Sequence, residues 1–276
     1  MEPNIAELIE RRFGMPAEAG RAWPATGTIA AMLAHRVHRR YTGAAIAEDT
    51  MQVLLAAALS APSKSDLQQA SVIRVRDAGL RREIDALTPG MPWVAEAPEY
   101  LVFCGDNRRH RQVAALRGKP FPNDTLDMFM NAAVDAGLVM QSFIIAAESV
   151  GLGCCPISLI RNPIERLGAL LALPPGVFPV AGLCVGHPAE AGRLSMRLPP
   201  AVTVHTDRYD ASGFEAELAA YDARRAAAEP PPRQKYVERF GEVTPYTWSE
   251  DKARQYAVPE RHAFGDWVRR QGFALR

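Results

Sequence analysis

A cluster of basic side chains near the start of the chain, in the stretch HRVHRRYTG (residues 35–43), is the first candidate for chemistry. Its ionisable members are His35, Arg36, His38, Arg39 and Arg40. Arginine forks bind phosphate and carboxylate groups through paired hydrogen bonds, so the cluster could be a cradle for one anion, a nucleic-acid contact or a solvated patch. The net charge of the chain is only +1, which argues against a general attraction to nucleic acid or to an anionic membrane.

Three further segments share this chemistry: PSKSDLQ (62–68), GCCPIS (153–158) and RLSMRLP (193–199). The first is a polar loop that can offer hydroxyls and backbone N–H groups, the second combines small residues with exposed backbone, and the third adds two arginines. A flat polar ring that carries a phosphate needs cations at one end and amide donors and acceptors along its edge. Together the segments have the parts of a flavin mononucleotide (FMN) site, although none is specific alone.

Several other kinds of site are not indicated. The chain lacks a GxGxxG motif after a strand, and it lacks GxxxxGK[ST], HExxH and GxSxG, so a Rossmann loop would not hold a nucleotide here. His35 and His38 have no carboxylate or cysteine near them, and we expect no metal site. The cysteines occur in apolar contexts without metal or redox spacing, and we expect buried, reduced thiols. They are Cys104, Cys154, Cys155 and Cys184.

The elements that must position these segments alternate along the chain. A helix is predicted from Glu48 to Leu59, ending at SAPSKSD. Strands are predicted over 71–75, 100–104 and 177–185 and through Ile157, and C-terminal helices over 249–256 and 261–271. The basic run 108–111 (RRHR) is interpreted as a solvated loop. This order predicts an α+β or α/β sandwich.

The longest apolar pattern, from Leu126 to Val150, predicts a helix of about 35 Å that is apolar around most of its circumference. Such a helix must be buried on all sides, in a large core or against a second subunit. Asp135, Gln141 and Glu148 interrupt the pattern, so we do not expect a membrane span. The acidic N-terminus is no secretory signal, and we expect a cytoplasmic protein.

Longer stretches of the sequence resemble the nitroreductase superfamily. These are HRVHRRYTGAAI, APSKSDLQQASVIRV and the run from IAAESVGLGCC to GLCVGHPAE. They are similar in particular to its NADPH-dependent branch of oxygen-insensitive nitroreductases and flavin reductases. The similarity runs from about His35 to Tyr209 and more loosely to the C-terminus. AAESVGLG and GLCVGHP are the specific motifs.

The resemblance implies an α+β fold in which helices flank a mixed sheet, within an intertwined homodimer that has a long central helix. It implies FMN bound between the subunits. Hydride would pass from NADPH or NADH to the flavin and then to a nitroaromatic, quinone or related small-molecule acceptor, by a ping-pong mechanism. The chain would comprise an N-terminal extension (1–27), an FMN-binding domain (28–210) and a helical region that completes the domain and contacts the partner (211–276).

The resemblance also assigns site residues. His35, Arg36 and Arg197 match the phosphate and ribityl end, and Arg39 matches a cation beside the flavin pyrimidine. The flavin loop contributed by the other subunit, and the segment against the ring, match Ser63, Lys64, Ser65, Gln68, Ile157 and Ser158. Arg239 matches an arginine that recognises NADPH, and no protein side chain is expected to act as a general acid or base because the flavin carries the hydride.

The chain departs from the family pattern at Val37, Ser195 and Met91, where serine, lysine and glutamine are usual. Two other functions remain open. One is a flavin reductase that releases reduced FMN, and the other, more distant, is a nucleic-acid-binding module that uses the basic clusters. We expect neither nucleic acid nor a membrane as a partner.

Overall fold

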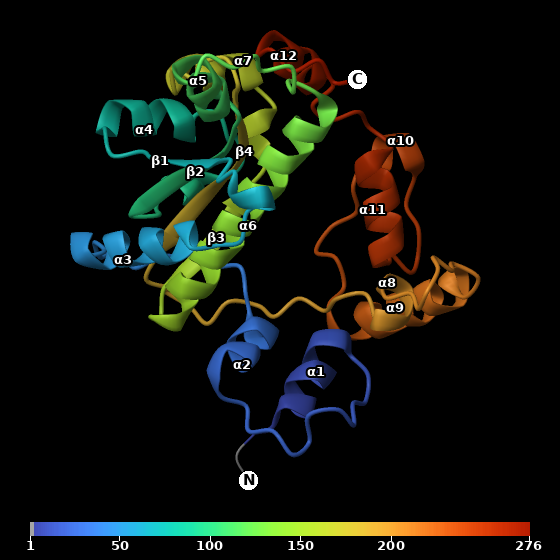
Figure 1. Cartoon of the computed structure of the whole chain (residues 1–276). Helices are drawn as coiled ribbons and strands as arrows, with labels where there is room; N and C mark the ends of the chain where they lie inside the picture. The colour runs from blue at the N-terminus through green and yellow to red at the C-terminus, as the bar shows by residue number, and fades with distance from the viewer. Residues whose placement is uncertain (1–2) are drawn as a thin grey trace. The chain divides into compact units, whose positions relative to one another are not determined.

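The computed structural model describes residues 3–276, and these form two compact units, whose elements are labelled in Figure 1. Unit 1 combines the chain up to His35 with residues 194–260, and unit 2 combines residues 36–193 with 261–276. These divisions differ from the boundaries predicted after residues 27 and 210. Segments far apart in the sequence pack into one unit, and no local change of composition marks that pairing.

The centre of unit 2 is a four-stranded sheet in the order β1-β2-β4-β3. Its strands are β1 (Ala70–Arg74), β2 (Glu99–Asp106), β3 (Gly153–Ile157) and β4 (Val177–Gly186). All three pairings are antiparallel, so the α+β class is confirmed, whereas the expected mixed sheet is reduced to one isolated parallel bridge beside β3. The inner strands β2 and β4 are buried almost throughout, as their apolar sequences predict.

The long predicted helix is α6 (Leu126–Ser149), which crosses one face of the sheet (Figure 1). Its buried side chains, such as Val139 and Phe143, share a core with Leu101 and Phe103 of β2 and with α3 (Glu48–Leu59). Among residues 3–276, α6 alone is long and apolar enough to cross a membrane. Because this face packs on the sheet, α6 is a core helix of unit 2.

The opposite face of α6 is apolar but uncovered within the chain. Leu126, Met130, Val134 and Leu138 recur every fourth residue and are 49%, 54%, 54% and 37% exposed. Residues at this spacing form one continuous stripe along a helix. We call these four residues the outer stripe. The expectation that α6 is buried on all sides is therefore not met by one chain alone.

Short helices complete unit 2: α4 (Ala78–Asp85), α5 (Arg108–Leu116), α7 (Ile164–Leu170) and α12 (Phe264–Arg270), with single turns at 64–66, 92–94 and 159–161. The cysteines are free and buried, as predicted. Burial raises the pKa of the Cys104 thiol to about 12 and that of Cys155 to about 11, so both stay protonated at neutral pH.

Unit 1 contains α1 (Ile5–Phe13), α2 (Gly27–Ala34), α8 (Pro200–Thr203), α9 (Phe214–Ala228), α10 (Val237–Phe240) and α11 (Trp248–Tyr256). Helix α9 meets α11 where the buried Tyr221 ring lies edge-on to Trp248, at 5.3 Å between centroids. Asp222 accepts hydrogen bonds from the N–H and the hydroxyl of Ser249 at the start of α11, which fixes that junction.

Candidate functional site

The basic stretch lies directly beside β3. Val37 forms a parallel bridge with Cys154 and an antiparallel bridge with Arg193, and the N–H of His38 donates to the carbonyl of Cys154 at 3.0 Å. A Cβ at Gly153 would fall 2.7 Å from the His38 ring, so the close approach requires glycine. Residues 37–38, Gly153–Cys154 and Arg193, which come from three segments singled out separately by the sequence analysis, are therefore neighbours in unit 2.

This placement also positions Arg36 and Arg39, two residues that were predicted to contact the flavin. The Arg36 guanidinium donates to the carbonyl of Ala191 at 3.1 Å. Arg39 is exposed, and its guanidinium lies 5.6 Å from the centre of the Trp93 ring. Arg39 also lies beside the Cys155 thiol, where it partly opposes the rise in pKa that burial causes. Arg39 is thus a cation near β3 whose guanidinium is oriented by its contact with the Trp93 ring.

The end of β3 carries the other two residues predicted from this region. Ile157 is 2% exposed. Its side chain packs in a hydrophobic cluster with residues of the sheet and of the helices α4 and α7. Ser158 follows the strand, and its hydroxyl accepts a hydrogen bond from Arg261 at 3.3 Å.

The predicted flavin loop, residues 62–68, has an unusual backbone. Ser65, Asp66 and Gln68 have φ values of 51°, 56° and 53°, and none of them is glycine. Each such left-handed residue costs on the order of 1–3 kcal/mol unless its surroundings hold it. The loop must therefore be fixed by contacts from elsewhere in unit 2.

Asp135 of α6 supplies one set of these contacts. Its carboxylate accepts hydrogen bonds from the Ser63 hydroxyl at 2.6 Å, from the Gln69 N–H at 2.9 Å and from the Lys64 N–H at 3.3 Å. The side chain is 2% exposed, so these bonds are made in a largely desolvated place, where charge-assisted bonds are strong. Both ends of the loop are thereby tied to one carboxylate.

Helix α5 supplies the second set, and here the interpretation of RRHR as a solvated loop is wrong. Arg109 donates to the carbonyls of Gln68 and Ala70, and Nε2 of His110 lies 2.6 Å from the carbonyl of Leu67. Because a carbonyl only accepts, this Nε2 carries a proton. The run is helical, and Arg109 and His110 bind the carbonyls of Gln68 and Leu67 in the flavin loop.

Five backbone N–H groups in the loop and directly after it already have hydrogen-bond partners. Besides Lys64 and Gln69, the N–H groups of Asp66, Leu67 and Gln68 bind Ser63 or Lys64. The expectation that this loop offers these N–H groups to a ligand is therefore wrong. What it presents instead are exposed side chains, above all Ser65 and Gln68.

A pocket of about 270 Å³ opens beside the loop. Its walls include Leu59, Ser63, Gln68, Arg109 and Asp135, so the anchors of the loop and its presented side chains border the same space. Apolar walls with a few fixed polar groups are the usual composition of a small-molecule site.

In unit 1, two predicted phosphate ligands converge on Arg12, a residue that the sequence analysis did not single out. The Arg12 guanidinium donates to the carbonyl of His35 at 2.6 Å, and the N–H of Arg197 donates to the carbonyl of Arg12 at 2.8 Å. Arg197 itself has an exposed side chain. No local sequence signal pointed to Arg12, because its partners lie 21 to 183 residues away.

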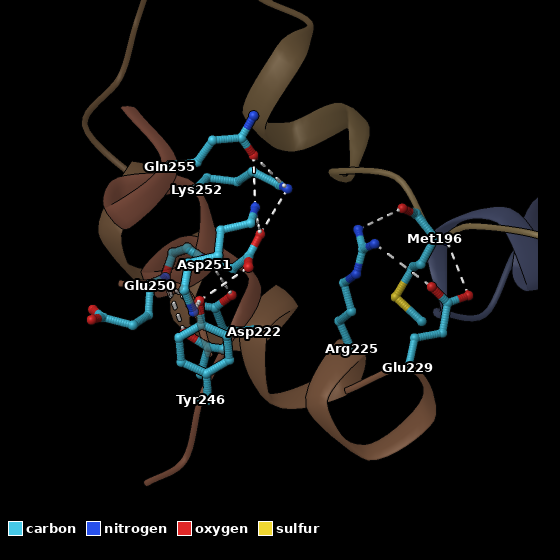
Figure 2. A network of polar contacts seen from close by, with 12 residues as sticks. Met196, Asp222, Arg225, Glu229, Tyr246, Glu250, Asp251, Lys252 and Gln255 are labelled. Atoms are coloured by element: carbon cyan, nitrogen blue, oxygen red, sulfur yellow. Dashed lines mark hydrogen bonds and ion pairs between the residues drawn. The ribbon is translucent and has the colours of Figure 1, made fainter. Parts of the chain in front are cut away.

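The segment that bears Arg197 is fixed from a second side as well, as Figure 2 shows. Glu229 accepts from the N–H of Met196 at 3.3 Å, and the carbonyl of Met196 accepts from Arg225 at 3.1 Å and from Tyr221 at 3.2 Å. The buried Met196 thus leaves its neighbour Arg197 at the surface in a defined place.

Arg239 lies on α10, and its guanidinium is 5.0 Å from the Phe240 ring centre. The Arg254 guanidinium binds the carbonyls of Lys235 and Gly241, one before and one after α10. Lys235 also reaches Asp251 and Gln255, whose polar cluster with Tyr246 appears in Figure 2. Helix α10 is therefore anchored to α11 at both ends.

A pocket of about 460 Å³ lies next to α10 in unit 1. It is lined by Arg233, Lys235 and Gln255, among others, and Arg239 is not part of its lining.

The antiparallel sheet crossed by one long helix defines an α+β protein. Arginines beside the edge strand and an anchored polar loop at the helix are the kinds of groups that a phosphate-bearing ring needs. Comparison with known proteins identifies it further. The nitroreductase family model matches residues 32–187, and the model of the nitroreductase family C-terminal domain matches residues 195–276. The chain belongs to the nitroreductase family.

Individual relatives agree with this assignment. The chain is 35% identical to an oxygen-insensitive NADPH nitroreductase of Salmonella typhimurium, over 90% of its own length and 99% of the relative's. It is 32% identical to an FMN reductase (NADPH) of Bacillus subtilis, over 89% and 98%. The structure of an NADPH:FMN oxidoreductase from Vibrio harveyi with NAD⁺ superposes with a TM-score of 0.78 at 31% identity, over 90% and 99%.

Proposed function

We propose that this protein is an FMN-dependent oxidoreductase that carries hydride from NADPH or NADH to nitroaromatic, quinone or related acceptors by a ping-pong mechanism. The observation that carries the proposal is the family fold, in which the arginines of the basic stretch lie near β3 and the polar flavin loop is anchored to Asp135 of α6. FMN, when bound, supplies the hydride chemistry, so the protein must bind, orient and shield it.

The residues present fit FMN. Arg36 is the candidate for the phosphate end and Arg39 for the pyrimidine. The Ile157 side chain is buried in the core, so this residue can meet the ring only through its backbone. His35 and Arg197 are the further candidates for the phosphate. The loop offers the remaining polar contacts, from Ser63, Lys64, Ser65 and Gln68, with Ser158 following Ile157.

The proposal includes a homodimer. The outer stripe on α6 leaves four large apolar side chains exposed at 37–54%, and a contiguous apolar surface of this kind favours burial against a partner. A second copy would bring its flavin loop, which follows α3 and is bound to the same α6, to the shared face. We expect this dimer to work in the cytoplasm, with neither nucleic acid nor a membrane as a partner.

The purified protein is expected to be a yellow dimer that loses flavin when the dimer dissociates. The measurement is a visible spectrum combined with light scattering over a dilution series. A colourless protein that gains no flavin spectrum on incubation with FMN would contradict both the cofactor and the reaction.

A flavin reductase is the second candidate, because relatives in Bacillus subtilis and Vibrio harveyi are named FMN reductase (NADPH) and NADPH-flavin oxidoreductase. The two candidates differ in the fate of the reduced flavin. Steady-state rates with free FMN, menadione and nitrofurazone as acceptors separate them, since a reductase should turn over free FMN fastest and a nitroreductase should keep its flavin bound.

Arg239 is the candidate residue for binding the 2′-phosphate that distinguishes NADPH from NADH. An exposed arginine–phosphate contact is worth about 1–2 kcal/mol after screening, so Arg239→Ala should raise the Michaelis constant for NADPH about five- to thirty-fold and leave that for NADH nearly unchanged. Arg233→Ala is the matched comparison, since Arg233 lines the neighbouring pocket. Loss of the NADPH preference with Arg233 alone would transfer the role to that residue.

A further inference from the structure

We propose that Arg12 is a positioning residue for the phosphate of FMN, so that α1 is a working part of the flavin site. The inference rests on the proposed flavin-binding function. It extends the site beyond the family match, because Arg12 lies before residue 32, where that match begins.

The contacts of Arg12 span three separate segments of unit 1. Its guanidinium donates to the carbonyl of Leu33 through Nε at 3.0 Å and a terminal nitrogen at 2.7 Å. It also donates to the carbonyls of His35 at 2.6 Å and Ser195 at 2.8 Å. One planar fork thereby joins α1, the end of α2 and the 194–199 segment.

Burial shows that these contacts are not incidental. Arg12 is 5% exposed, whereas the adjacent Arg11 is exposed on the same helix. A buried guanidinium is costly unless its N–H groups find acceptors, and here backbone carbonyls serve as acceptors. The planar fork suits this task, and lysine could not reproduce it because its three donors radiate from one atom.

The consequence for the phosphate site follows from what Arg12 holds. The Arg12 side chain binds the carbonyl of His35, and its own carbonyl receives the N–H of Arg197. Arg12 therefore contacts the backbone of both predicted phosphate ligands of unit 1, and Glu229, Arg225 and Tyr221 hold the Arg197 segment from its other side. The Arg12 charge adds a fixed positive potential at the same place, since it sits within hydrogen-bonding distance of both segments.

The test compares the affinity of the protein for FMN with its affinity for riboflavin, which has the same ring and no phosphate. Arg12→Met is expected to weaken FMN binding about ten-fold or more, because misplacing phosphate ligands loses charge-assisted hydrogen bonds, and to change riboflavin binding by less than about two-fold. Arg11→Met removes the same charge from the next position and is expected to change neither. The readout is a fluorescence titration of the apoprotein, with each variant's unfolding temperature recorded.

Arg12→Lys is the second variant, and it keeps the test decisive if Arg12→Met fails to fold. It keeps the charge but cannot bridge the three carbonyls, so FMN affinity should fall about three-fold or more, again with riboflavin nearly unchanged. Equal losses for FMN and riboflavin would reduce Arg12 to general support of the fold and overturn the inference, as would unchanged FMN affinity. A wild-type protein that binds neither flavin would contradict the proposed function itself.

Discussion

Val134→Asp is expected to weaken self-association at least about 100-fold and to release the flavin at concentrations where the wild-type protein is a yellow dimer. Val134 lies in the middle of the outer stripe and is 54% exposed. Burying one such side chain is worth about 1.5–3 kcal/mol, and a two-fold axis counts each substitution twice. A buried aspartate adds its own desolvation cost, so the effect exceeds the loss of contact alone.

The measurement is sedimentation velocity or light scattering over a dilution series, with bound flavin followed by absorbance. Val204→Asp is the matched control, because Val204 is 68% exposed and belongs to unit 1 and not to the stripe. The dimer proposal for this face would be refuted by a Val134→Asp protein that dissociates at the same concentration as Val204→Asp.

Asp135→Asn, at the very next position, is expected to act through the loop instead of the dimer. Asparagine keeps the size but turns one acceptor oxygen into a donor that faces the N–H and O–H groups of the loop. A hydrogen bond to a charged group contributes about 1.5–3 kcal/mol, so unfolding free energy should fall by about that amount. FMN affinity should fall about ten-fold, since the loop would have to be ordered on binding.

Amide hydrogen exchange over residues 64–69 reports the loop directly and should accelerate in this variant. Asp127→Asn is the matched control on the same helix. Asp127 is exposed and pairs with Lys64 at 3.5 Å, and a surface pair of this kind is worth about 0–1 kcal/mol. If both variants showed the same exchange and the same flavin affinity, the anchoring role of Asp135 would be wrong.

The sequence was sufficient to predict most helices and strands and to group the basic stretch with the other motifs of the candidate site. The predicted strands and the helices over 48–59, 126–150 and 249–256 are present, because their apolar periodicities reflect the faces they bury. Two of the motifs that carry the family resemblance are neighbours in unit 2, because Val37 and His38 contact Cys154. The assignments of individual residues to flavin atoms stay predictions.

What could not be predicted depends on contacts between distant residues. Arg12 looks like any arginine of an amphipathic helix until the carbonyls of residues 33, 35 and 195 are placed around it. The RRHR run looked solvated because charge alone does not reveal a carbonyl partner. Asp135 did leave a signal, since a carboxylate inside an apolar helix needs a buried partner, but the sequence does not say which one.

The anchored backbone of the flavin loop also matters for engineering. Because Asp135, Arg109 and His110 hold backbone groups of residues 64, 67, 68 and 69, the exposed side chains at positions 65 and 68 can be varied in a library while these anchors stay in place. Glycine or asparagine at these positions would also suit the left-handed backbone at φ 51° and 53°. The choice of electron acceptor could then be redesigned by side-chain exchange at two sites, while Gln69 and Asp135 are left untouched.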